Sequence, residues 1–388
     1  MLSAPQLQMP AVTRFVDGSG PVFAGALFPF LFITIACGAV SGFHALVSSG
    51  TTPKLLSNEA DARAIGYGGM LTEAAVAIMA LIAASALQPG VYFAMNAPAA
   101  LIGTTVESAA QAISQWGFVV TPELLATTAR DIGETSILSR TGGAPTLAVG
   151  MAVLLQGVVA GPGMLAFWYH YAILFEALFI LTTVDAGTRV ARFMIQDLAA
   201  IAVPSLGRTE SWLGNLGATA IAVGGWGWFL VQGVTDPLGG INTLWPLFGI
   251  ANQMLAGMAL LFCCVALVKM KRERYLWVAA LPTAWLLVCT LTASWQKLFE
   301  PDPRIGFLAA ARKFADAAAR GEVIAPATSL EQMQRIVLNN RIDAALCVLF
   351  AGVLLAMLLY AIQAMRQAHR NANPTVMEAP YVALDALA

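Results

Sequence analysis

The chain has 388 residues, of which 58% are hydrophobic and 11% are charged, and its formal net charge is −1. So many apolar side chains exclude a soluble globular protein and are typical of a helical membrane protein. The near-neutral charge gives no sign of a nucleic-acid partner. We therefore expect an all-α, polytopic bundle of seven or eight transmembrane helices, with the lipid bilayer as its surroundings.

The first apolar stretch runs from Val22 to Val47 and has no acidic or basic side chain except His44. Since about 20 apolar residues cross the core of a bilayer, this stretch predicts a membrane helix. The helix is expected to break at residues 49–53, which are Ser-Gly-Thr-Thr-Pro. Irregular backbone at membrane depth is tolerated only where protein or a water-filled cavity surrounds it, so a substrate pathway is predicted there. The candidate substrate- or ion-binding residues of this segment are Ser41, Gly42, His44, Ser48, Ser49, Thr51 and Thr52.

The same segment leaves several interpretations open. Gly38 and Gly42 would allow a second helix to approach closely. His44 is either a proton relay near neutral pH or a buried histidine bonded to a neighbouring group. Ser41 beside His44 also permits an intramembrane serine protease, in which a histidine activates a buried serine. The local pattern Gly-x-x-Ser-Gly differs from the Gly-x-Ser-Gly of that class, so we expect neither an enzyme nor a cofactor.

Residues 1–388 are expected to form a single membrane domain. A polar connector from Lys54 to Tyr67 would follow the first span, and Glu73, near the start of the second span, is expected to be structural. Residues 89–144 lack an apolar run of spanning length. The predicted divisions are residues 21–88 with the first two spans, 89–144 as a surface or re-entrant segment, 145–294 with the central spans, 295–342 as an extracytoplasmic loop, 343–366 as the last span and 367–388 as a cytoplasmic tail.

One basic turn predicts the orientation of the chain. Four Lys and Arg residues lie within residues 269–274, and the positive-inside rule places so short and basic a turn in the cytoplasm. Alternation of the spans then places residues 235–242 and 297–341 outside. Before Met164 the loops on the two sides of the membrane have nearly equal numbers of Lys and Arg residues, so the orientation of that part stays open.

Glu176 lies in the middle of an apolar run, with Tyr169 seven residues before it and Thr183 seven residues after it. Residues seven apart lie near one face of a helix. Ionisable side chains within a membrane are costly and mark functional sites by default, so Glu176 is predicted to carry a coupling proton. The alternative is a protonated glutamic acid that bonds to a neighbouring helix.

Two polar pairs each have two interpretations. Asp185 and Arg189, one helical turn apart, form either an ion or substrate site or an i,i+4 ion pair at the cytoplasmic interface. Arg189 would suit a carboxylate substrate because its guanidinium binds two oxygens. Asn252 and Gln253 follow Pro246 in a later span, and they either bind a substrate or join helices.

The cysteines give no metal-binding pattern, because all of them lie in apolar runs without histidines or cysteines at ligand spacing. We therefore predict no metal site and expect the cysteines to be small buried apolar side chains. These residues are Cys37, Cys263, Cys264, Cys289 and Cys347.

Three longer stretches carry a family resemblance. They are residues 28–54, residues 168–189 with Trp-Tyr-His-Tyr and Leu-Thr-Thr-Val-Asp-Ala-Gly-Thr-Arg, and residues 244–253 with Leu-Trp-Pro-Leu-Phe-Gly-Ile-Ala-Asn-Gln. The chain resembles the carbon starvation protein A family of bacterial inner-membrane transporters, over nearly all of its own length but only about the C-terminal half of a typical member.

The resemblance implies uptake of pyruvate, in symport with a proton, or of peptides during carbon starvation. It also implies a helical architecture like that of the amino acid, polyamine and organocation transporters, whose broken helices hold the substrate in the membrane. The block at residues 182–189 is implied to be important as a whole. The half that is absent leaves a non-transporting membrane scaffold or sensor as the alternative function.

Overall fold

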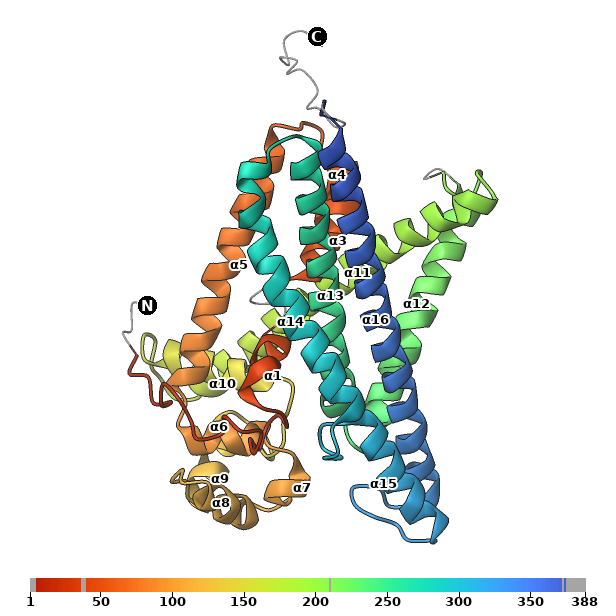
Figure 1. Ribbon diagram of the computed structural model, residues 1–388. Coiled ribbons are helices and arrows are strands. Elements are labelled where there is room, and N and C mark those ends of the chain that lie inside the picture. Colours follow the sequence, from red (N-terminus) through yellow and green to blue (C-terminus); the bar gives the residue numbers. More distant parts are fainter. Residues whose placement is uncertain (1–4, 36–39, 209–210, 372, 375–388) are drawn as a thin grey trace.

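The computed structural model describes residues 5–35, 40–208, 211–371 and 373–374, apart from the side chains of residues 240–243. All the regular elements in these ranges are helices (Figure 1), so the all-α prediction is confirmed. Five helices of the described chain are long and apolar enough to cross a membrane, namely Asp61–Ala86, Met164–Ala202, Leu244–Lys269, Glu273–Phe299 and Leu330–Arg370. The larger count of seven or eight spans stays a prediction.

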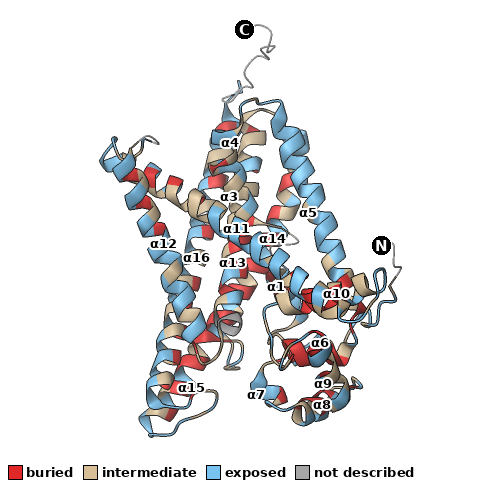
Figure 2. Cartoon of the chain, turned by 180° about the vertical axis from the view of Figure 1, so that it is seen from behind, coloured by how far each residue is buried: buried red, intermediate tan, exposed pale blue. Residues whose placement is uncertain are grey.

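Three of these long helices form the centre of the bundle. They are α13 (Gly240–Lys269), α14 (Leu276–Phe299) and α16 (Leu330–Arg370), and each of them packs against the other two. In its most apolar window α13 is 44% buried, against 11% for α5 (Asp61–Ala86) and α11 (Met164–Ala202). Figure 2 shows the same contrast, since α5 and α11 are largely exposed along their lengths.

The first predicted span is interrupted at two places, one of which was predicted. The chain forms α1 (Leu27–Thr34), α3 (Gly42–Gly50) and α4 (Thr52–Leu55). The predicted break at residues 49–53 is confirmed, because α3 ends at Gly50 and a separate short helix, α4, begins at Thr52. A second interruption lies between α1 and α3, and there Ser41 caps α3 by accepting a hydrogen bond from the His44 amide. Gly38 lies outside the described residues.

The segment before α11 contains short helices. These are α6 (Pro89–Asn96), α7 (Ala99–Ile102), α8 (Val106–Gln115), α9 (Pro122–Asp131) and α10 (Ala144–Gln156). Thr105 and Thr121 cap α8 and α9 through their side chains. The short helices share a hydrophobic core that also includes Tyr169 and Ala172 of α11. As predicted, the described part of residues 89–144 has no helix of spanning length.

Several predicted boundaries are wrong because helices continue past the apolar runs. The second span begins at Asp61, so most of the predicted connector from Lys54 to Tyr67 is helical. Part of the predicted outer loop, residues 295–342, is also helical, since it contains α15 (Phe307–Ala319) and the start of α16. Polar side chains end an apolar pattern without ending a helix, and tertiary packing then decides where the helix stops.

The cysteine prediction holds in part. Cys264, Cys289 and Cys347 are buried, whereas Cys263 is exposed on α13 and corrects the expectation that all would be buried. Cys37 lies outside the described residues. Adjacent helical residues point about 100° apart, so two neighbouring cysteines need not share an environment.

One end of the bundle is tied together around the basic turn. Lys271, in the turn between α13 and α14, donates hydrogen bonds to the carbonyls of Ala368 and His369 near the end of α16. The His369 ring lies 2.9 Å from the Glu273 carboxylate. Figure 1 places this turn, α4 and the end of α16 at one end of the molecule, and α15 with α6–α9 at the other.

The close packing of α1 on α13 predicts a stability difference between two glycines of α13. A Cβ atom at Gly249 would lie 2.4 Å from the Ile33 carbonyl oxygen, whereas at Gly257 the nearest atom would be 3.7 Å away. We expect Gly249→Ala to lower stability by about 1–3 kcal/mol, because backbone atoms must move. Thermal unfolding in detergent measures the effect, with Gly257→Ala as the matched control. Equal unfolding midpoints for the two variants would contradict the packing described.

Candidate functional site

The interruption between α1 and α3 leaves backbone groups without helical partners. Two neighbouring side chains of α13 bind these groups. Gln253 donates from Nε2 to the carbonyl oxygen of Phe32 at 2.5 Å, and Asn252 accepts from the amide of Phe43 at 2.9 Å. Both side chains are buried, with 1% and 3% exposure. Of the two interpretations of this pair, the structure therefore supports the joining of helices.

Gly42 allows the start of α3 to lie directly against α13. A Cβ atom there would be 2.1 Å from the Asn252 carbonyl oxygen and 2.5 Å from the Leu255 side chain. The predicted role of Gly42 in close helix approach is thus confirmed. Together, α1, α3 and α13 form a junction in which side chains of α13 bind backbone groups of both shorter helices.

The hydroxyl groups of α3 and α4 are mostly used within their own segment. Ser48 and Ser49 donate to the Ala45 carbonyl at 3.0 and 2.8 Å, and Thr52 donates to the Val47 carbonyl at 3.1 Å. Thr51 differs, because its Oγ1 is buried and has no hydrogen-bond partner among the described residues. Of these four predicted binding residues, Thr51 is therefore the one whose side chain has unused hydrogen-bonding capacity in the interior.

His44 faces the second span. Its Nε2 lies 3.2 Å from a carboxylate oxygen of Glu73, with 52% and 43% of the two side chains exposed. The interpretation of His44 as a buried histidine is therefore wrong, although it does bond to a neighbouring helix. Glu73 connects α5 to α3, in agreement with its predicted structural role.

The three polar residues predicted to share one face of α11, namely Tyr169, Glu176 and Thr183, lie in different surroundings. The Tyr169 hydroxyl donates to Glu134 at 3.2 Å, and Glu134 forms an ion pair with Arg140 at 3.0 Å, so Tyr169 belongs to the connection between α9 and α10. One carboxyl oxygen of Glu176 is buried without a hydrogen-bond partner among the described residues. Thr183 is exposed and donates to the Phe179 carbonyl of its own helix.

Asp185 and Arg189 form an i,i+4 ion pair of 2.8 Å on the exposed part of α11. The same helix reaches the junction through Gly187, where a Cβ atom would lie 3.4 Å from the Phe43 ring. Helix α3 contacts both α11 and α13. The structure thus brings the start of α3 together with Asn252, Gln253 and the middle of α11, but does not bring Tyr169 to that place.

The sequence analysis missed a buried polar group deeper in the bundle. Lys297 of α14 and Asp343 of α16 are each 2% exposed. Two further buried polar residues, Ser294 and Thr290, lie on α14 before Lys297. The Thr290 hydroxyl donates to the Gln253 side chain at 3.3 Å. The spacing of residues 290, 294 and 297, four and then three apart, was a usable signal of one helical face.

Comparison with known proteins gives a consistent family. The family described as "Carbon starvation protein CstA" matches residues 1–293. Peptide transporter CstA of Escherichia coli (strain K12) is 60% identical over 98% of this chain and 55% of its own length. Pyruvate/proton symporter BtsT of the same organism is 51% identical over 97% of this chain and 56% of its own length.

Another peptide transporter CstA, from Campylobacter jejuni, is 60% identical over 77% of this chain and 42% of its own length. The chain therefore spans about half the length of the curated relatives it matches. The relatives' names are those of transporters and not of enzymes, as the family resemblance implied. No solved structure matches the chain.

The contacts at the helix junction predict a specific loss on removal of one amide. Gln253→Leu keeps the approximate shape but leaves the Phe32 carbonyl and the Thr290 hydroxyl without this partner. We expect a loss of stability of about 1–3 kcal/mol, the usual cost of an unsatisfied buried polar group. Thermal unfolding in detergent would be compared with Gln363→Leu, at an exposed position of α16. A Gln253 variant as stable as this control would contradict the role assigned to the amide.

Proposed function

Since the chain belongs to the carbon starvation protein CstA family, we propose that it acts in a secondary transporter that takes up a small carbon source by proton symport during carbon starvation. The cargo would be pyruvate or peptides. The observation that carries the proposal is the interrupted helix, whose two ends are held on α13 by Asn252 and Gln253. Secondary transporters place their substrate and ion sites at such interruptions.

Pyruvate and peptides have a carboxylate in common. Helix α3 begins at the junction, and the first turn of a helix favours negative charge. The substrate carboxylate would therefore lie near the first turn of α3, and the buried Thr51 hydroxyl, at the opposite end of α3, would be too distant to contact it. Arg189 would take part only after leaving Asp185, its ion-pair partner.

The finer architecture belongs to the same proposal. The five long apolar helices would form five of the spans. Two more would be helix α12 (Trp212–Thr235) and the interrupted α1–α3 segment, and the short apolar α10 would be the eighth. An interrupted first span supports a likeness to the amino acid, polyamine and organocation transporters. The protein would lie in the bacterial inner membrane, with the basic turn at residues 269–274 in the cytoplasm.

The proposal predicts uptake of labelled pyruvate or of a labelled dipeptide into proteoliposomes under an imposed proton gradient. The uptake should disappear when a protonophore collapses the gradient, because the gradient supplies the driving force. The chain should be tested alone and together with the part of the E. coli peptide transporter that it does not cover. Absence of transport of both substrates in both preparations would contradict the proposal and favour a scaffold or sensor.

Glu176 is proposed to carry a coupling proton, because one oxygen of its carboxyl group lacks a partner within the described part of α11 and its neighbours. Glu176→Gln keeps the size of the side chain but cannot release a proton. We expect this variant to lose accumulation against a substrate gradient while it retains exchange of internal for external substrate. Glu123→Gln, at an exposed position of α9, is the control. Normal accumulation by the Glu176 variant would exclude this role.

A further inference from the structure

Lys297 places a positive charge in the interior of the bundle. It is 2% exposed, and its Nζ lies 5.5, 5.2 and 5.5 Å from the ring centroids of Phe23, Phe30 and Phe307. At these distances the faces of aromatic rings attract an ammonium group. In the part of the chain that the structure describes, Lys297 forms neither a hydrogen bond nor an ion pair. An ammonium buried in this way requires a negative charge nearby.

Asp343 provides that charge from α16. It is 2% exposed, and its Oδ2 has no hydrogen-bond partner among the described residues. The charged side chains near it are those of Asp236 at the end of α12 and of Lys297 on α14, which lies beyond ion-pair distance, and the Cys347 thiol lies one turn further along α16. A buried carboxylate oxygen without a donor is costly, and a proton at that oxygen removes the buried negative charge.

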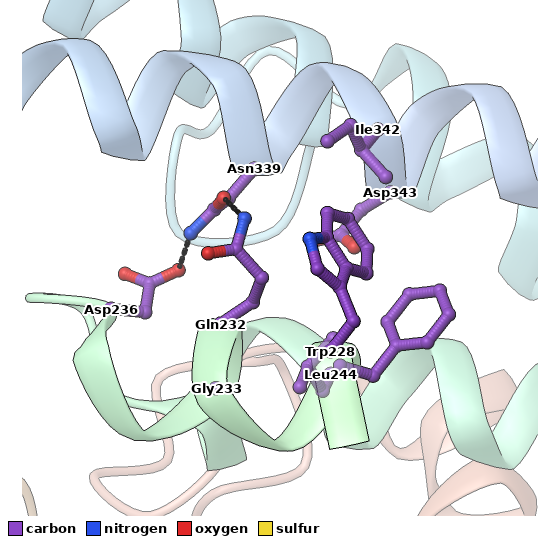
Figure 3. Close-up of a pocket in the computed structure, with 9 residues that line it drawn as sticks. Trp228, Gln232, Gly233, Asp236, Leu244, Asn339, Ile342 and Asp343 are labelled. Atoms are coloured by element: carbon purple, nitrogen blue, oxygen red, sulfur yellow. Dashed lines mark hydrogen bonds between the residues drawn. The ribbon is translucent and has the colours of Figure 1, made fainter. Parts of the chain in front are cut away.

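A narrow pocket connects Asp343 to the surface between α12 and α16. Its walls include Asp343, Asp236, Asn339, Gln232 and Trp228, and its enclosed part has room for about one water molecule. Asn339 donates to Asp236 at 2.8 Å, and Gln232 donates to Asn339 at 3.2 Å. Figure 3 shows these hydrogen-bonded side chains on one side of the pocket and Asp343 beside the ring of Trp228. The Asp343 carboxyl group therefore lies at the wall of a small pocket that polar side chains share with the apolar side chains of Phe229, Leu244 and Ile342.

On the other side of Lys297, a row of buried polar side chains reaches the helix junction. Ser294 and Thr290 lie on the same face of α14 as Lys297, and the Ser294 hydroxyl donates to the Thr290 carbonyl at 2.7 Å. Thr290 bonds to Gln253, which holds the end of α1. Each of these side chains is at most 2% exposed. Polar groups thus extend from the pocket to the candidate substrate site through the interior.

We propose that Asp343 is a proton-binding site between this pocket and the helix junction, and that Lys297 is its fixed counter-charge. The inference rests on the proposed function, because it assigns a proton site to the same transporter. A proton from water in the pocket binds Oδ2 and converts the carboxylate to the neutral acid, and its release restores the carboxylate. Asp343 lies on α16 and is separate from Glu176 on α11.

The pair gives a physical reason for coupling a proton to an anionic substrate. With Asp343 ionised, the Lys297 charge is balanced. With Asp343 protonated, that positive charge is unbalanced, and it lies beside Phe30 of α1, the helix whose last turn Gln253 holds at the junction. Proton binding therefore favours binding of a carboxylate at the junction, and carboxylate binding favours the proton by the same factor.

Infrared spectroscopy tests the proton site without any need for transport. Difference spectra of the membrane-reconstituted chain between about pH 5 and about pH 8 should contain the C=O stretching band of a buried carboxylic acid. The band should lose intensity in Asp343→Asn. The control is Asp302→Asn, because hydrogen bonds from Arg304 hold the pKa of Asp302 below its usual value. A spectrum unchanged by Asp343→Asn would overturn the proposal even if wild-type uptake is normal.

Uptake experiments separate a proton site from a purely structural charge pair. Asp343→Asn should lose gradient-driven accumulation of pyruvate and dipeptide but keep exchange. The double variant Asp343→Asn/Lys297→Gln removes both charges, so it should fold and exchange substrate but still not accumulate it. Glu331→Gln, exposed at the start of the same helix, is the control.

Accumulation by the double variant at the wild-type level would overturn the proposal, because it would show that the pair only balances charge. Proton-driven accumulation by Asp343→Asn at the wild-type level would also overturn it. If the wild-type chain transports neither substrate in any preparation, the proposed function fails, while the infrared result still decides whether Asp343 takes up a proton.

Discussion

Backbone groups exposed by an interrupted helix cannot find water in the core of a membrane, so protein groups must bind them. In this chain two adjacent residues of α13 do so, Gln253 at the end of α1 and Asn252 at the start of α3. The rest of the bundle is arranged to keep these two amides in place. Gln253 is bonded in turn to Thr290 of α14, and through α14 the junction is connected to α16.

The same requirement explains where small residues are needed. Amide side chains are short, so the two half-helices must lie directly on α13. Gly42 on α3 and Gly249 on α13 permit this approach, since a Cβ atom at either position would meet backbone within 2.4 Å. The most buried membrane helix is consequently the one that carries Asn252 and Gln253. Fold and candidate site therefore depend on the same contacts.

Sequence patterns predicted the features that depend on local composition. The apolar runs indicated the long helices, and glycine and polar residues in residues 38–53 indicated an interruption. The end of α3 at Gly50 agrees with this pattern, whereas the wider interruption between α1 and α3 depends on tertiary contacts, here from Asn252, that a local pattern does not contain. Lys297 and Asp343 were missed for a similar reason. Each lies at the edge of an apolar run and resembles a loop residue, and only the packing of α14 on α16 shows that both are buried.

The hydrogen bonds of Lys271 have a mechanical consequence. They fasten the turn between α13 and α14 to the last turn of α16, while the pocket beside Asp343 lies toward the opposite end of these helices. Because α13, α14 and α16 are bonded to one another at this end, any displacement of one helix relative to another increases with distance from the turn. Any rocking of α16 against α14 is therefore smallest at the basic turn and larger at the buried charge pair.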